Sequence, residues 1–244
     1  MFTSNPFADL GNFLPPLFMQ VYIVLMVVAV VIGTLLDVHH KGSGIFFARR
    51  REESQARAQR RLGRAETVSL AIETIAEAAV SGEFCKWPRR VSHLLMMYGF
   101  FVYLISTVLM VFGYPAGVST PAILPTLWTL GALMILAGGL WFFFFLRVNV
   151  AYDGASPFSL GRADLFVGSL IVSVAFGLVW QAASNRIVFW IYLFFTTLLF
   201  VSVPWSKFGH MFFKPAVAFQ RRVEEASGSS DLPSPGVESH IVRT

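Results

Sequence analysis

Five long apolar runs constrain this chain more than any other feature of its sequence. They cover Leu14–Leu36, His93–Tyr114, Pro121–Leu146, Leu165–Ala182 and Ile187–Trp205, and none has Asp, Glu, Lys or Arg in its interior. About 20 helical residues cross a bilayer, and lipid offers no partner to a free backbone amide, so each run is expected to be a helix. The runs are continuously apolar, whereas barrel strands alternate. We therefore predict an all-α integral membrane protein with five transmembrane helices.

The distribution of basic residues predicts the orientation. Eleven of the 19 Lys and Arg residues lie between the first two runs, and five follow the last run. Because basic loops stay in the cytoplasm, we expect the N-terminus outside and the C-terminus in the cytoplasm, in a bacterial inner membrane. The net charge of +5 then reflects topology rather than nucleic-acid binding, because the 55% hydrophobic chain leaves no compact soluble domain for that role.

The runs divide the chain into four predicted regions. Residues 1–36 form a periplasmic N-terminus and a first span, which we expect to be retained because the start has no basic residue. Residues 37–91 form a basic cytoplasmic segment, and residues 92–211 form a four-helix membrane part. Residues 212–244 form a cytoplasmic tail, and its Ser-, Gly- and Pro-rich composition after Val223 predicts a disordered end.

The basic segment is expected to contain two helical parts. Residues 46–64 are highly charged and are predicted to continue the first span as a helix. Residues 64–80 place one apolar stripe at spacings of three and four, which predicts an amphipathic helix. This stripe would lie on the membrane, on a partner or on the chain's own helices, and it consists of Val68, Ile72, Ile75 and Ala79.

Tryptophan and cysteine usage adds two expectations. Trp128, Trp180, Trp190 and Trp205 lie near predicted span ends, which is typical of side chains that anchor a helix at the membrane interface. Cys85 is the single cysteine, so the chain can form neither an internal disulfide nor a four-cysteine iron–sulfur site.

Two histidines lie where a haem would need them. His93 begins the second predicted span and His210 ends the fifth, so both are expected at cytoplasmic helix ends and at similar depth. Two imidazoles on facing helices are the ligands of a bis-histidine haem. Arg89, Arg90 and Lys207 flank them and would pair with the propionates. The alternative is that each histidine is an ordinary interfacial residue.

A second pair, His39 and His40, lies at the cytoplasmic end of the first span. Four roles remain open for it: an interfacial position, a haem ligand, a pair with Asp37, or part of a quinone pocket. The sequence favours the interfacial role.

Two stretches resemble a known family. Residues 82–110, "GEFCKWPRRVSHLLMMYGFFVYLISTVLM", and residues 205–219, "WSKFGHMFFKPAVAF", resemble the second-span entry and fifth-span ending of a cytochrome b family. The family comprises the membrane subunits of respiratory nitrate reductase gamma type and of quinone-interacting, heterodisulfide-reductase-like complexes. The resemblance implies that His93 and His210 hold the haem b nearer the cytoplasm.

The same resemblance implies that one haem has been lost and that the chain works with a soluble subunit. A second, outer haem of the nitrate reductase type would have its ligands at the positions of Tyr103 and Tyr192, so the outer haem is expected to be lost. Some quinone-interacting members carry a fused iron–sulfur domain, and none is expected here, so a separate cytoplasmic iron–sulfur or flavin subunit would supply the clusters. A short, five-span chain of this kind also resembles the membrane anchor that accompanies adenylylsulfate reductase in sulfur-oxidising bacteria.

Three functions follow as hypotheses. The first is an electron-transfer subunit of a respiratory or sulfur-metabolism oxidoreductase, which passes electrons between quinone and a cytoplasmic partner through one haem b and has no complete active site of its own. The second is a haem-free anchor of the same kind of complex. A transporter is less favoured, because ion transport usually requires charged side chains within the spans and these spans have none.

Overall fold

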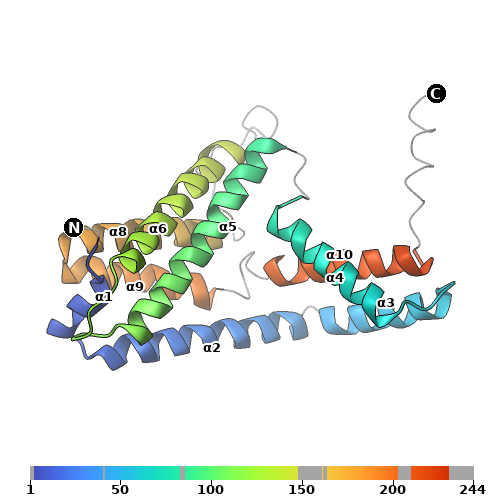
Figure 1. Ribbon diagram of the computed structural model, residues 1–244, viewed down its shortest axis with the longest axis horizontal. Coiled ribbons are helices and arrows are strands. Elements are labelled where there is room, and N and C mark those ends of the chain that lie inside the picture. The colour runs from blue at the N-terminus through green and yellow to red at the C-terminus, as the bar shows by residue number, and fades with distance from the viewer. Residues whose placement is uncertain are drawn as a thin grey trace. The chain divides into compact units, whose positions relative to one another are not determined.

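The computed structural model describes residues 3–40, 42–82, 86–147, 161, 164–202 and 210–230, with the backbone alone at residues 43 and 210–213. These residues form helices and no β-strand, so the all-α prediction is confirmed for them (Figure 1). The elements are α1 (Pro6–Asp9), η1 (Leu10–Asn12), α2 (Pro16–His40), α3 (Ser43–Arg57), α4 (Arg64–Ala79), α5 (Trp87–Val108), η2 (Leu109–Gly113), α6 (Ile123–Trp141), η3 (Phe142–Leu146), α8 (Leu165–Ala183), α9 (Arg186–Val201) and α10 (His210–Ser227).

The chain divides into two compact units. The first unit contains residues 1–36 and 81–209, and the second unit contains residues 37–80 and 210–244. Residues 37–80 of the predicted basic segment therefore share a unit with the predicted tail, whereas residues 81–91 belong to the first unit.

Within the described residues, four helices are long and apolar enough to cross a membrane: Pro16–His40, Trp87–Gly113, Ile123–Leu146 and Leu165–Ala183. They correspond to the first four predicted spans and indicate a multi-pass membrane protein whose surroundings are a lipid bilayer. The fifth apolar helix, α9, has 16 residues. The fifth span, its predicted end near residue 205 outside the described residues, and the orientation of the termini stay predictions.

In the first unit, α5 and α6 lie side by side because small residues face one another (Figure 1). A Cβ atom on Gly99 would lie 2.8 Å from the Gly131 carbonyl oxygen, and one on Gly131 would lie 2.8 Å from the Gly99 carbonyl oxygen. About two helical turns before Gly99, the Ser92 hydroxyl donates to the Gly138 carbonyl oxygen at 2.8 Å. Small residues of this kind let membrane helices approach closely, so the α5–α6 contact depends on backbone proximity.

The helices α8 and α9 form a second antiparallel pair. Ser184 ends α8 in the left-handed conformation, with φ +49°. Asn185 then begins α9, and its side-chain oxygen accepts from the Ile187 amide at 2.8 Å and from the Val188 amide at 3.3 Å. The helix end and the helix start are therefore satisfied within a two-residue turn. α2 joins this pair through Tyr22, whose hydroxyl contacts that of Thr197 at 3.0 Å.

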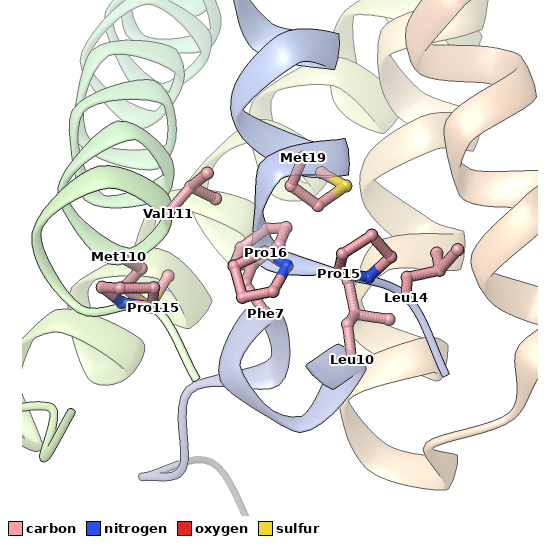
Figure 2. A pocket seen from close by; sticks show the side chains of 9 residues that line it. All are labelled: Phe7, Leu10, Leu14, Pro15, Pro16, Met19, Met110, Val111 and Pro115. Atoms are coloured by element: carbon pink, nitrogen blue, oxygen red, sulfur yellow. The ribbon is translucent and has the colours of Figure 1, made fainter. Parts of the chain in front are cut away.

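The N-terminal segment closes one end of the first unit. The Asn5 amide donates to the Tyr114 carbonyl oxygen at 3.0 Å and to the Thr120 hydroxyl at 3.1 Å. Phe7 meets the rings of Trp128 and Trp180 edge to face, at centroid distances of 6.1 and 5.3 Å. Beside it lies a small apolar hollow between the N-terminal segment, the start of α2 and η2, with no room for a ligand larger than a water molecule (Figure 2).

The second unit contains α3, α4 and α10. Gly42, with φ +61°, separates α2 from α3, so the predicted continuation of the first span begins as a new helix. The helix predicted over residues 46–64 is confirmed only as far as Arg57, because residues 58–63 are not helical. The amphipathic helix predicted over residues 64–80 is confirmed as α4, which packs against α10. α10 continues through Ser227, so the disorder predicted directly after Val223 is wrong for the next four residues.

α4 is oriented opposite to the simplest expectation for an amphipathic helix. Its buried residue is Thr74, whose hydroxyl donates to the Leu70 carbonyl oxygen at 2.7 Å. The predicted apolar stripe instead is largely exposed, at Val68, Ile72 and Ile75. The side chains of Glu73 and Glu77 pair with Arg222 of α10, so acidic residues rather than the stripe attach α4 to its neighbour.

Candidate functional site

His93 lies in the second turn of α5, on a half-buried position of the first unit. Its Nδ1 atom is 2.8 Å from the Ser81 hydroxyl oxygen. Ser81 follows α4 and is 1% exposed. Its backbone has φ +50°, in the left-handed region that a residue with a side chain rarely adopts. The contact therefore joins the second residue after α4 to the second turn of α5.

The chemistry of this contact depends on which imidazole nitrogen carries the proton. A hydroxyl oxygen accepts a hydrogen bond as readily as it donates one. With the proton on Nδ1, His93 donates to Ser81 and the basic lone pair lies on Nε2. Histidines that bind a metal by one ring nitrogen almost always donate the N–H of the other nitrogen to an oxygen. The donor set at His93 therefore fits an iron ligand.

The other predicted members of the haem site have different placements. His210 begins α10, in the second unit, and its side chain, like the whole of Lys207, lies outside the described part of the chain. The predicted pairing of His93 with His210 stays a prediction. Arg89 is exposed and donates to the Leu146 carbonyl oxygen at 3.3 Å, at the C-terminal end of η3, where a cation is favourable. Arg90 is half-buried one residue later on α5.

Tyr103 and Tyr192, at the positions of the lost outer-haem ligands, do face each other. Both are buried, at 8% and 3% exposure, and the Tyr103 hydroxyl donates to the Tyr192 hydroxyl at 3.4 Å. An iron with its macrocycle would have to separate these two oxygens, which are already within hydrogen-bond reach. A second haem held by these residues therefore does not fit.

The space around the two tyrosines is filled by tryptophan. Trp128 stacks on Tyr103 with centroids 4.7 Å apart, and Trp180 stacks on Tyr192 at 5.7 Å. A Cβ atom on Gly177 would lie 2.9 Å from the Tyr103 hydroxyl oxygen. The Trp128 indole donates to the Thr107 hydroxyl at 2.9 Å. We call Tyr103, Trp128, Trp180 and Tyr192 the aromatic quartet.

The predicted interfacial role is wrong for Trp128 and Trp180, because both are buried in the first unit. Trp190 is about half exposed, as an interfacial anchor would be, and Trp205 lies outside the described residues. Sequence position could not separate these cases, since a tryptophan near a span end fits the interface and the interior equally well. The close glycine at position 177 was a signal for the interior, because it leaves room for a large ring.

His39 and His40, at the end of α2, are both exposed, which agrees with the interfacial role that the sequence favoured. Asp37, one turn earlier, is buried.

The chain was compared with models of protein families, with curated proteins and with solved structures, and no match was found in any of them.

Proposed function

We propose that the chain is the membrane-anchoring, electron-transferring subunit of a respiratory or sulfur-metabolism oxidoreductase in a bacterial inner membrane. It exchanges electrons between quinone and a cytoplasmic iron–sulfur or flavin subunit through one haem b. The observation that carries the proposal is the engagement of His93 Nδ1 by a hydroxyl, 2.8 Å away, near the start of a long apolar helix.

His93 and His210 would be the axial ligands, and the haem would supply one-electron exchange at a site where the chain itself has no redox group. Arg89, Arg90 and Lys207 would hold the propionates. Arg89 already donates to a helix-terminal carbonyl, and an ionised carboxylate is a better acceptor than that carbonyl. Exchange of the Leu146 carbonyl for a propionate as the acceptor of Arg89 would therefore be favourable.

The contact between the Tyr103 and Tyr192 hydroxyls leaves no place for an outer haem between them, which limits the path that electrons could take. A single inner site supports exchange between a quinone and a soluble partner at the cytoplasmic side, rather than transfer across the whole bilayer. The soluble partner by this proposal is an iron–sulfur or flavin enzyme of the adenylylsulfate reductase kind, and the second unit would contact it.

Purified full-length protein tests the haem directly. We expect a reduced-minus-oxidised spectrum of b type, lost in both His93→Ala and His210→Ala. His240→Ala in the tail is the matched control and should retain the spectrum. Normal haem content in both test variants would eliminate the assignment. Co-purification with the product of a neighbouring oxidoreductase gene would identify the soluble partner.

A haem-free anchor is the second candidate, and the aromatic quartet favours it. Four large rings already fill the interior at the position where the resembling family holds a cofactor. By this alternative the inner site has lost its haem too, and the chain holds its partner at the membrane without redox chemistry. Protein made with ample haem would then contain none, while the partner would still co-purify.

A further inference from the structure

We infer that Ser81 is a positioning residue for His93: its hydroxyl accepts the Nδ1–H of the imidazole, holds the ring, and selects the tautomer with its lone pair on Nε2, the nitrogen that would bind the haem iron. The inference rests on the proposed function and deepens it, because it names the residue that tunes the iron ligand. Both residues belong to the first unit.

The backbone of Ser81 carries the first argument. Left-handed backbone costs a residue with a Cβ about 1 kcal/mol, and glycine is the residue that ordinarily ends a helix in this conformation. Gly82 lies directly after Ser81, yet the left-handed position itself is occupied by serine. A conformation of this cost persists where the surrounding structure uses it. The side chain at residue 81 therefore has a contact that glycine would lack.

The environment of the hydroxyl carries the second argument. Ser81 is almost wholly buried, and a buried hydroxyl requires a partner. Its partner is an imidazole 12 residues away, on the next helix. Ser92, next to His93 on α5, shows the contrast: it is equally buried, but its hydroxyl donates to the Gly138 carbonyl oxygen at 2.8 Å. Only the first of these two serines is placed to act on the imidazole.

The chemical consequence follows from the direction of the hydrogen bond. An acceptor at Nδ1–H increases the electron density on the ring and makes Nε2 a stronger ligand. A stronger axial donor stabilises oxidised iron and lowers the midpoint potential. Loss of such an outer partner typically weakens metal binding about tenfold or more. Ser81 would thus affect both haem retention and potential without touching the iron.

The experiment uses full-length protein and three substitutions at one position. Ser81→Ala removes the hydroxyl and keeps the Cβ, Ser81→Gly removes it and relieves the backbone, and Ser81→Thr keeps it. We expect the first two to bind haem about tenfold more weakly and to show a higher midpoint potential, whereas Ser81→Thr should resemble the unchanged protein. Ser92→Ala is the matched control and should leave the midpoint potential unchanged.

A second measurement needs no haem. Nitrogen NMR of histidine-labelled, haem-free protein reports the tautomer of His93, assigned by its loss in His93→Ala. We expect the Nδ1–H tautomer, replaced by Nε2–H in Ser81→Ala. Finding Nε2–H in the unchanged protein would overturn the inference. A b-type spectrum that requires His93 but has the same midpoint potential in Ser81→Ala would overturn the role of Ser81 and leave the proposed function standing. A protein without haem whose His93 shows the Nδ1–H tautomer would support the role of Ser81 and contradict the proposed function.

Discussion

The helices within the first unit and the helices within the second unit are joined by different kinds of contact. In the first unit the contacts between helices are stacked rings, glycines and single hydroxyls, as in the aromatic quartet and the Gly99–Gly131 approach. In the second unit they include several guanidinium–carboxylate pairs. Arg50 of α3 donates from Nε and Nη2 to the two carboxylate oxygens of Glu224 on α10, at 2.8 and 2.7 Å.

The difference reflects what surrounds each unit. Polar atoms among apolar helices must find partners within the protein, since hydrocarbon provides none. Ser106, Thr107 and Thr196 each do so locally, by donating to a carbonyl three or four residues back on the same helix. The ion pair of Arg147 with Asp164 in the first unit lies outside the apolar helices, between the end of η3 and the start of α8. Charge is thus placed at helix ends, and the two side chains of this pair, 9% and 17% exposed, neutralise each other.

Truncation of a ring in the aromatic quartet should lower the free energy of unfolding more than any other change considered for either unit. Tyr103→Ala removes a buried ring stacked on Trp128 and should cost about 3–5 kcal/mol of unfolding free energy. Tyr103→Phe keeps the ring and loses only the hydroxyl contact with Tyr192, so its cost should stay below about 1 kcal/mol. Unfolding in mixed micelles measures both. Equal losses would mean that the hydroxyl, not ring packing, stabilises this interior.

The close approach of α5 and α6 should rank second. Gly131→Ala places a methyl group 2.8 Å from backbone atoms of Gly99 and Tyr103, and neither atom can move without its helix. We expect a loss of about 2–3 kcal/mol. Gly168→Ala in α8 is the control, because a Cβ there meets no atom within 4 Å. If both substitutions were neutral, backbone proximity would not hold this pair.

In the second unit, Glu224→Gln should be the most disruptive single change. Glu224 is 2% exposed but Arg50 remains partly exposed, so we expect about 2 kcal/mol, below the full cost of an isolated buried charge. Glu225→Gln removes a neighbouring exposed pair with Arg221 and should cost less than about 0.5 kcal/mol. Hydrogen exchange of α3 and α10 distinguishes them. Identical exchange rates in the two variants would contradict the burial argument.

The same carboxyl predicts a pH dependence confined to the second unit. Hydrogen bonds from Arg50 lower the pKa of Glu224 below its usual value of 4.5. A group with a lowered pKa in the folded state stabilises above its unfolded pKa, and the contribution disappears as the pH falls through the folded pKa. Hydrogen exchange of α10 should therefore accelerate below about pH 4, and less so in Glu224→Gln. Acceleration of equal size in that variant would assign the effect to other groups.

The smallest effect is expected where charge is most exposed. Glu77→Gln removes one of two carboxylates that pair with Arg222, and Glu73 remains 3.2 Å from the same guanidinium. We expect less than about 0.5 kcal/mol, decreasing further in high salt. Thermal unfolding at low and high ionic strength provides the measurement. A loss as large as that of Glu224→Gln would show that exposure does not rank the ion pairs of this unit.

The sequence predicted most of the helices, because their signals are local. Charge-free runs marked the four long apolar helices, and periodicity marked α4. The errors concern residues whose environment comes from distant segments. Trp180 is enclosed partly by Phe7, and Glu224 is ordered by Arg50, 174 residues away. The composition near Val223 indicates disorder, because local composition carries no information about a contact with the distant Arg50.

The candidate site follows the same pattern. His93 could be proposed from its position at the start of an apolar run, and Tyr103 with Tyr192 from the resemblance. The two tyrosines, on α5 and α9, do contact each other through their hydroxyls. Ser81 could not be proposed, because a serine before a glycine at a helix end reads as an ordinary turn. Its contact with His93 depends on a left-handed backbone that the sequence does not encode in any short motif.

The pairing of α4 with α10 has a consequence for biosynthesis. Glu73 and Arg222 are 149 residues apart, and the apolar helices of the first unit lie between them in the chain. At about 5–20 residues per second, the ribosome needs roughly 7–30 s to supply α10 after α4 has been made. During that interval α3 and α4 exist without their third helix, and Glu73, Glu77 and Arg50 have no α10 to bind. The second unit is therefore completed only after the described apolar helices of the first unit have been synthesised, so its ion pairs between α4 and α10 form late in translation.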